Sequence, residues 1–136
     1  MGAQILVIED NPENLELMRY LLSAFGHSPF HAATGEQGVR IAAERPTHLV
    51  LCDLQLPDID GFEVLRRLRA QPQTARVPIV AVTALAMVGD RERALAAGFD
   101  AYVSKPIDPE SFVRQVESLM PAELRGRAPA GSKGGA

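Results

Sequence analysis

The chain has 136 residues, of which 46% are hydrophobic and 23% charged, a balance typical of one folded domain rather than of a disordered segment. Its formal net charge of −3 provides no overall positive field to attract nucleic acid or anionic lipid. Cys52 is the only cysteine, so the sequence excludes an intrachain disulfide and a zinc site built on a cysteine pair.

The first residues do not predict export or membrane insertion. The opening apolar run, Ile5 to Ile8, is too short for the core of a signal peptide, and no charged leader precedes it. No stretch reaches the length of a membrane span. A lone thiol is also compatible with a reducing compartment. We therefore expect a soluble, cytoplasmic protein that binds neither membrane nor nucleic acid.

Short apolar runs alternate with helical patterns along the chain. The runs are rich in Ile, Leu and Val and predict buried strands, namely Gln4–Ile8, Ser28–Ala32, His48–Cys52, Ile79–Thr83 and Ala101–Ser104. A helix is predicted to begin after Asn11, where a cap, a proline and an acid follow one another, and to end at Gly26. Asp108 opens the last helix in the same way. The other predicted helices are roughly Gly35–Glu44, Gly61–Ala70 and Asp90–Ala97.

This order of elements predicts an α/β fold. Strands joined by crossover helices of this length pair in parallel, so the sequence predicts a doubly wound, five-stranded parallel sheet with five helices on its two faces. From Pro121 onward, Pro, Ala and Gly dominate and no periodic apolar face remains. We therefore expect one domain over residues 1–120 and a flexible tail over residues 121–136.

Polar residues follow the predicted strands at their carboxyl ends, where ligands bind to parallel sheets. They are Glu9 and Asp10 after the first strand, Asp53 after the third, Thr83 at the end of the fourth and Lys105 after the fifth. Clustered acids repel one another, and a hard divalent cation such as Mg²⁺ relieves that repulsion. Mg²⁺ also organises phosphoryl transfer, for which an aspartate can be the nucleophile.

These motifs resemble those of the response-regulator receiver domain over residues 4 to about 120. The matching features are Glu9-Asp10-Asn11, Asp53 with Leu56-Pro57 and Asp60-Gly61, Thr83-Ala84 and Lys105-Pro106. The segments 80–84 and 99–107 are most similar to stand-alone regulators and to receivers of hybrid kinases. The resemblance implies the flavodoxin-like strand order 2-1-3-4-5.

The family resemblance also implies roles for single residues. Asp53 would be the phosphoacceptor, and Asp10 and Asp53 would ligate Mg²⁺ together with the backbone carbonyl of Gln55. Glu9 would act on the metal through water. Lys105 and Thr83 would assist phosphoryl transfer, and the bond before Pro106 would be cis.

The resemblance further implies a switch in which the Thr83 hydroxyl turns toward the phosphoryl group and Tyr102 moves inward beside strand five. A half-buried, purely structural Tyr102 is nearly as well supported. Leu15 lies off the centre of the core face of its helix, so we expect it to be partly exposed. With Ile107 it is our candidate for docking the kinase.

The donor would be a histidine kinase or a histidine phosphotransfer protein, and the output would pass to a downstream protein target. Such a receiver catalyses only its own phosphorylation and dephosphorylation, and in that sense it is not an enzyme. The receiver module of a hybrid histidine kinase is an alternative. A Mg²⁺-dependent phosphohydrolase is less favoured, because Gln55 stands where a second acid would be needed.

The remaining polar and small residues receive structural interpretations. Three histidines show no metal-ligand spacing and are interpreted as surface or loop residues, namely His27, His31 and His48. Cys52 is expected to be a buried, inert thiol. Gly35 and Gly38 lack the Gly-Lys-Ser/Thr that would complete a phosphate loop, and we expect them to serve a turn and close packing.

Overall fold

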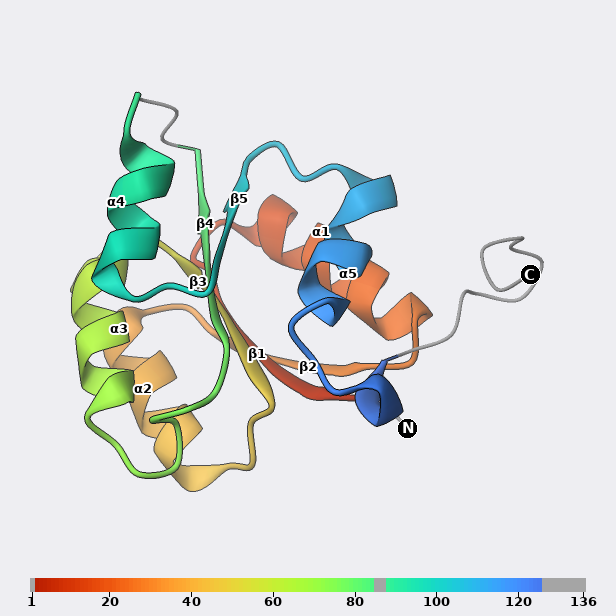
Figure 1. Cartoon of the computed structure of the whole chain (residues 1–136), viewed down its shortest axis with the longest axis horizontal. Coiled ribbons are helices and arrows are strands. Elements are labelled where there is room, and N and C mark those ends of the chain that lie inside the picture. The colour runs from red at the N-terminus through yellow and green to blue at the C-terminus, as the bar shows by residue number, and fades with distance from the viewer. Residues whose placement is uncertain (1, 85–87, 126–136) are drawn as a thin grey trace.

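The computed structural model describes residues 2–84 and 88–125, which form alternating strands and helices (Figure 1). The strands are β1 (Gln4–Ile8), β2 (Ser28–Ala32), β3 (Leu49–Asp53), β4 (Ile79–Thr83) and β5 (Ala101–Ser104). The helices are α1 (Pro12–Ala24), α2 (Gly35–Glu44), α3 (Gly61–Arg69), α4 (Asp90–Ala97) and α5 (Pro109–Glu117), followed by a 3₁₀ turn, η1 (Ala122–Leu124). None of the described helices is both long and apolar enough to cross a bilayer.

The five strands form one parallel sheet in the order β2-β1-β3-β4-β5, which confirms the predicted flavodoxin-like fold. Helices α1 and α5 cover one face of the sheet, and α2, α3 and α4 cover the other (Figure 1). Successive strand residues point to opposite faces, so Ile5 and Val7 enter the core beneath α1 and α5, whereas Leu6 and Ile8 enter the core beneath the other helices. Burial on both faces explains why the central strands are apolar without alternation.

Side chains that precede the helices fix their starting points. The carboxylate or amide oxygens of Asn11, Asp60 and Asp108 accept hydrogen bonds from backbone amides of the first turn, and the Thr34 hydroxyl does the same for α2. Each cap satisfies a helix amide that has no partner within the helix. The predicted starts of α1 and α5 follow from this chemistry.

Two predicted glycine positions depend on close packing. A Cβ on Gly35 would lie 2.5 Å from Ile59 Cγ1, and one on Gly38 would lie 2.4 Å from Ile8 Cδ1. Helix α2 therefore approaches both β1 and the loop after β3 more closely than a larger residue would permit. The packing role expected for these glycines is confirmed.

The structure shifts two predicted boundaries by one residue. β3 runs over Leu49–Asp53 rather than His48–Cys52, and α3 ends at Arg69. The chain also remains structured beyond residue 120, because η1 follows and Leu124 packs against the core beneath α1 and α5. The rest of the predicted tail, residues 126–136, lies outside the described residues.

One histidine differs from its interpretation. His27 does lie in a loop, but its side chain is fully buried, whereas His31 and His48 are exposed. The reason is a pair of hydrogen bonds: Nδ1 accepts from the backbone amide of Ala3 at 2.9 Å, and Nε2 lies 2.6 Å from Glu117 Oε2. The ring thus joins the start of β1 to the end of α5. No sequence pattern signals partners so far apart along the chain.

Candidate functional site

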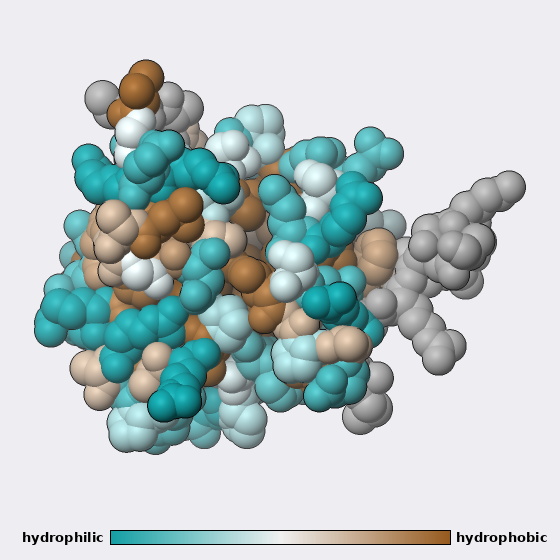
Figure 2. All heavy atoms as spheres, viewed as in Figure 1, coloured by the Kyte–Doolittle hydropathy of each residue, from teal (hydrophilic) through white to brown (hydrophobic). Residues whose placement is uncertain are grey.

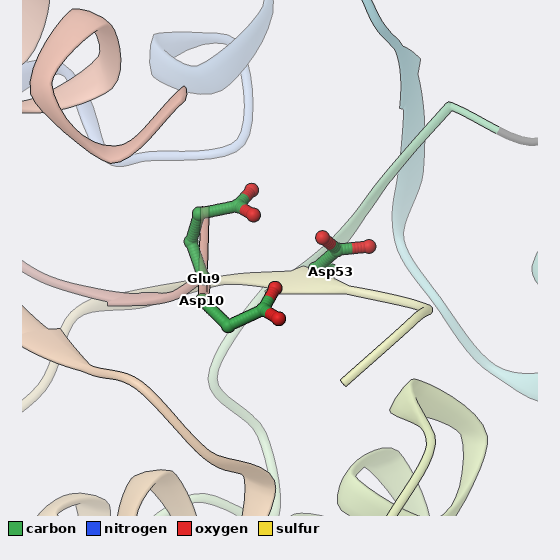
Figure 3. Close-up of side chains that lie close together, drawn as sticks. All are labelled: Glu9, Asp10 and Asp53. Carbon is green, nitrogen blue, oxygen red and sulfur yellow. The ribbon is translucent and has the colours of Figure 1, made fainter. Parts of the chain in front are cut away.

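Three acids meet at the carboxyl edge of the sheet. Glu9 and Asp10 directly follow β1, and Asp53 is the last residue of β3. The two strands are neighbours, and Ile8 pairs in register with Cys52, so the residues that come next lie level with each other. Figure 3 shows the three carboxylates gathered around one space. This placement is the one that the order of the strand ends predicts.

The acids lie close enough to act as one group. Each contributes a carboxylate oxygen that lies within 4.8 Å of those of the other two. Glu9 is 1% exposed and Asp53 5% exposed, whereas Asp10 is exposed. Buried like charges at this separation repel with little screening by water, so the cluster favours a cation or a bound proton.

Lys105 supplies positive charge to the site. Its ammonium Nζ lies 2.9 Å from Asp53 Oδ2 and 2.9 Å from Glu9 Oε1, and its side chain is only 10% exposed. The Lys105–Pro106 peptide bond is cis. One lysine therefore bridges two buried acids, which leaves the site with more negative than positive groups.

The remaining carboxylate oxygens are held by the backbone. Asp53 Oδ1 accepts a hydrogen bond from the Gln55 amide at 2.9 Å, and Glu9 Oε2 accepts one from the Asn11 amide at 3.2 Å. Within residues 2–84 and 88–125, Glu9 Oε1 accepts no well-directed hydrogen bond, although Lys105 lies beside it. The charge on this oxygen is therefore offset by the ammonium of Lys105 rather than by an aligned hydrogen bond.

The protonation of Glu9 reflects this environment. Burial, together with the neighbouring Asp53, raises its pKa to about 7 against the opposing effect of Lys105. Burial alone would lower the pKa of Lys105, but its hydrogen bonds to Asp53 and Glu9 prevail and raise the pKa above the ordinary value. Lys105 therefore stays charged at neutral pH, while Glu9 titrates near neutrality.

These observations fit a hard divalent cation. Three clustered carboxylates offer the oxygen ligands that Mg²⁺ prefers. Asp10 and Asp53 present oxygens to the shared space (Figure 3). The residues present could therefore hold Mg²⁺ without rearrangement of the fold.

Thr83 and Tyr102 lie on the neighbouring strands. Thr83 ends β4 and is fully buried, and Tyr102 lies on β5 and is half-buried. Burial, with a contribution from Asp90, raises the pKa of Tyr102. The Tyr102 ring lines a groove of about 340 Å³, which is also lined by Arg91, Ser104, Pro106, Ser111 and Gln115. In the view of Figure 2, hydrophobic residues show between the hydrophilic residues that cover much of the surface.

The exposure predicted for Leu15 is wrong. Leu15 is 8% exposed and belongs to the core beneath α1 and α5, and Ile107 is 6% exposed in the same core. Helix α1 packs against α5 as well as against the sheet, so its buried stripe is wider than the sheet alone would require. Neither side chain offers much surface to a partner in this structure.

Comparison with known proteins agrees with this geometry. Residues 5–117 match the family model of the response regulator receiver domain. The chain belongs to that family. A curated relative, the polar-differentiation response regulator DivK of Brucella ovis, is 36% identical over 120 residues, which cover 88% of this chain and 98% of DivK.

Two solved receiver structures resemble the chain closely. The receiver domain of the sensor histidine kinase PA1611 from Pseudomonas aeruginosa, with a magnesium ion in its active-site cleft, is 38% identical, with a TM-score of 0.80 over 88% of this chain and 98% of that one. The second match comes from a co-crystal of the Saccharomyces cerevisiae histidine phosphotransfer protein Ypd1 with the receiver domain of its downstream response regulator Ssk1. It is 28% identical, with a TM-score of 0.78 over 88% of this chain and 89% of that one.

Sequence reasoning gave Asn11 only a capping role in this receiver domain. In the structure its side chain caps α1, while its backbone amide donates to Glu9 Oε2. The available signal for this contact was the position of Asn11 directly after Glu9 and Asp10, because the preceding carboxylates lie within reach of its backbone amide.

Proposed function

We propose that this receiver domain accepts a phosphoryl group on Asp53 from a phosphohistidine donor, with Mg²⁺ bound at the acid cluster. The observation that carries the proposal is the buried Asp53–Lys105 ion pair beside two further acids. A purely structural ion pair would not require the additional acids, whose repulsion destabilises the folded chain.

In the proposed reaction, a carboxylate oxygen of Asp53 attacks the phosphorus of the donor. The new O–P bond forms as the P–N bond to the histidine breaks, and the electron pair returns to the imidazole. Lys105 Nζ lies beside Asp53 Oδ2 and can bind an oxygen of the incoming phosphoryl group. The Gln55 amide holds the other carboxylate oxygen, which fixes the orientation of the nucleophile.

Asp10, Asp53 and the backbone carbonyl of Gln55 are the proposed metal ligands, and Glu9 is proposed to act through water. The bound Mg²⁺ would neutralise charge on the transferred phosphoryl group. The fit rests on the clustered carboxylate oxygens, and the related PA1611 receiver was crystallised with magnesium in its cleft.

The switch is proposed to involve Thr83 and Tyr102. Phosphorylation adds up to two negative charges and three acceptor oxygens at Asp53. The Thr83 hydroxyl would turn toward these oxygens, and Tyr102 would move further into the groove beside β5. Helix α4 borders this face and is short, with few buried side chains, so its displacement costs little.

The proposed partners are a histidine kinase or histidine phosphotransfer protein and a downstream protein target. The match to a receiver crystallised with Ypd1 supports the first, and the similarity to DivK supports a response regulator. The similarity to the PA1611 receiver equally supports the alternative of a module from a hybrid histidine kinase.

The test is incubation with Mg²⁺ and a small-molecule phosphodonor, followed by intact mass measurement. We expect one added phosphoryl group, its absence after chelation, and its loss in Asp53→Asn. Equal labelling of that variant would show that Asp53 is not the acceptor. Release of phosphate far beyond one equivalent would instead favour a phosphohydrolase.

A further inference from the structure

The loop between β3 and α3 is tied to α2 by one acidic side chain. Asp58 Oδ1 accepts a hydrogen bond from the Gly35 amide at 2.8 Å, and Oδ2 accepts one from the Glu36 amide at 2.8 Å. These are the first two amides of α2, which have no partners within the helix. Asp58 thus joins two segments that are 23 residues apart.

The start of α2 does not depend on Asp58 for its own cap. The Thr34 hydroxyl accepts a hydrogen bond from the Gln37 amide at 3.1 Å, and the Gln37 side chain accepts one from the Ala33 amide at 2.9 Å. These two hydrogen bonds cap the first turn of α2 without any contribution from Asp58. The contact of Asp58 is therefore additional, and its effect is to hold the loop.

The same loop carries Gln55, whose amide contacts Asp53 and whose carbonyl is a proposed metal ligand. Its ends are closed by a hydrogen bond from the Gly61 amide to the Leu54 carbonyl at 3.1 Å. Between these points, the loop contacts α2 through Ile59, which packs against Gly35, and through Asp58. The first contact is apolar and undirected, whereas the second is charged and directional.

The ionisation of Asp58 favours a persistent link. The side chain is exposed, and although desolvation acts to raise its pKa, hydrogen bonds from backbone amides, led by those of Glu36 and Gly35, together outweigh that effect and lower the pKa. The carboxylate is therefore charged at neutral pH and lies at the positive end of the α2 dipole.

We propose that Asp58 is a positioning residue for the phosphoryl-accepting site: by bridging to α2, it holds the loop so that Gln55 stays oriented toward Asp53 and the metal. The inference rests on the proposed function. Asp58 itself touches none of the reacting groups.

The variant Asp58→Asn tests this directly. It keeps the size of the side chain but replaces one acceptor oxygen by an amide group that cannot accept from α2. We expect Mg²⁺ titration of the ¹⁵N-labelled protein by NMR to give about tenfold weaker binding, as when a partner behind a metal ligand is lost. In the metal-free protein, we also expect faster hydrogen exchange at the Gln55 and Gly61 amides.

Thr34→Ala is the matched control, because it removes a cap at the same helix end and leaves the bridge in place. We expect Thr34→Ala to lose about as much unfolding free energy as Asp58→Asn, while its Mg²⁺ affinity and the hydrogen exchange of its Gln55 amide stay unchanged. Normal Mg²⁺ binding by Asp58→Asn, or equal weakening in Thr34→Ala, would overturn the positioning role alone. Absence of Mg²⁺ binding by the unsubstituted chain would overturn the proposed function and this inference together.

Discussion

At the amino ends of the strands, polar side chains are matched with partners, whereas at the carboxyl ends one lysine pairs with two acids of a cluster of three. His27 is held between Ala3 and Glu117, and Arg69 pairs with Asp100 at 2.8 Å. Asp100 in turn accepts a hydrogen bond from the first amide of β4 at 2.8 Å. Each of these groups joins an element to its neighbour.

The carboxyl edge has no such balance. Glu9 and Asp53 are buried beside Asp10, and Lys105 is the basic side chain that pairs with them in the described part of the chain. Matched polar groups strengthen a fold, and an unmatched excess of charge weakens it. The comparison indicates that one edge serves stability and the other binds ligands, since departures from good packing and pairing concentrate at functional sites.

The largest effect is expected from breaking the matched edge. His27→Ala removes the hydrogen bond to Glu117, leaves the Ala3 amide without its acceptor and opens a cavity. We expect a loss of about 3 kcal/mol in the free energy of unfolding, measured with urea. Phosphorylation of Asp53 should persist under conditions in which the variant is folded.

His48→Ala is the control for this experiment. The His48 ring also accepts a hydrogen bond through Nδ1, from the Gln4 amide at 2.9 Å, but it is exposed. We expect a loss of less than about 1 kcal/mol, because water can replace the ring as acceptor. Equal losses in the two variants would contradict the importance of burial.

A comparable effect, which depends on pH, is expected from the excess charge at the other edge. Because the pKa of Glu9 rises from 4.5 to about 7 on folding, the folded chain holds a proton that the unfolded chain has released. The metal-free protein should therefore lose about 3 kcal/mol of stability as the pH rises from 4.5 through 7.

Glu9→Gln removes this titration. Urea unfolding of both proteins in chelator at several pH values should show the loss in the parent chain and a flatter profile in the variant. If the unfolding free energies of the two proteins changed with pH in parallel, Glu9 would not be the group whose titration lowers stability.

The smallest effect is expected from Mg²⁺ itself. At ten times its dissociation constant, a ligand that binds only the folded state adds about 1.4 kcal/mol of stability. We expect this increment at pH 7.5 in the parent chain and in His27→Ala, whose site is intact, and a reduced increment in Asp53→Asn. Loss of the increment in His27→Ala would show that the two edges are coupled.

Much of the molecule could be predicted from local patterns. Apolar runs placed all five strands within one residue of their observed bounds, and the caps at Asn11 and Asp108 fixed two helix starts. The candidate site followed because parallel strands bring their carboxyl ends to one edge. Glu9, Asp53 and Lys105 could thus be brought together without coordinates.

Other features depend on partners that are distant in sequence. The burial of Leu15 follows from the packing of α1 against α5, which no pattern within α1 reveals. His27 differs from His48 only in what surrounds it, and Asp58 differs from other loop acids only because α2 begins beside it.

The sequence by itself determined the elements, their order and the residues at each strand end, because these depend on periodicity and capping over a few neighbouring positions. Only the tertiary structure decided how far each charge is buried and which groups face it. Burial and Coulomb interaction depend on distances between segments, so the raised pKa of Glu9 and the bridge from Asp58 to α2 emerge only in the folded chain.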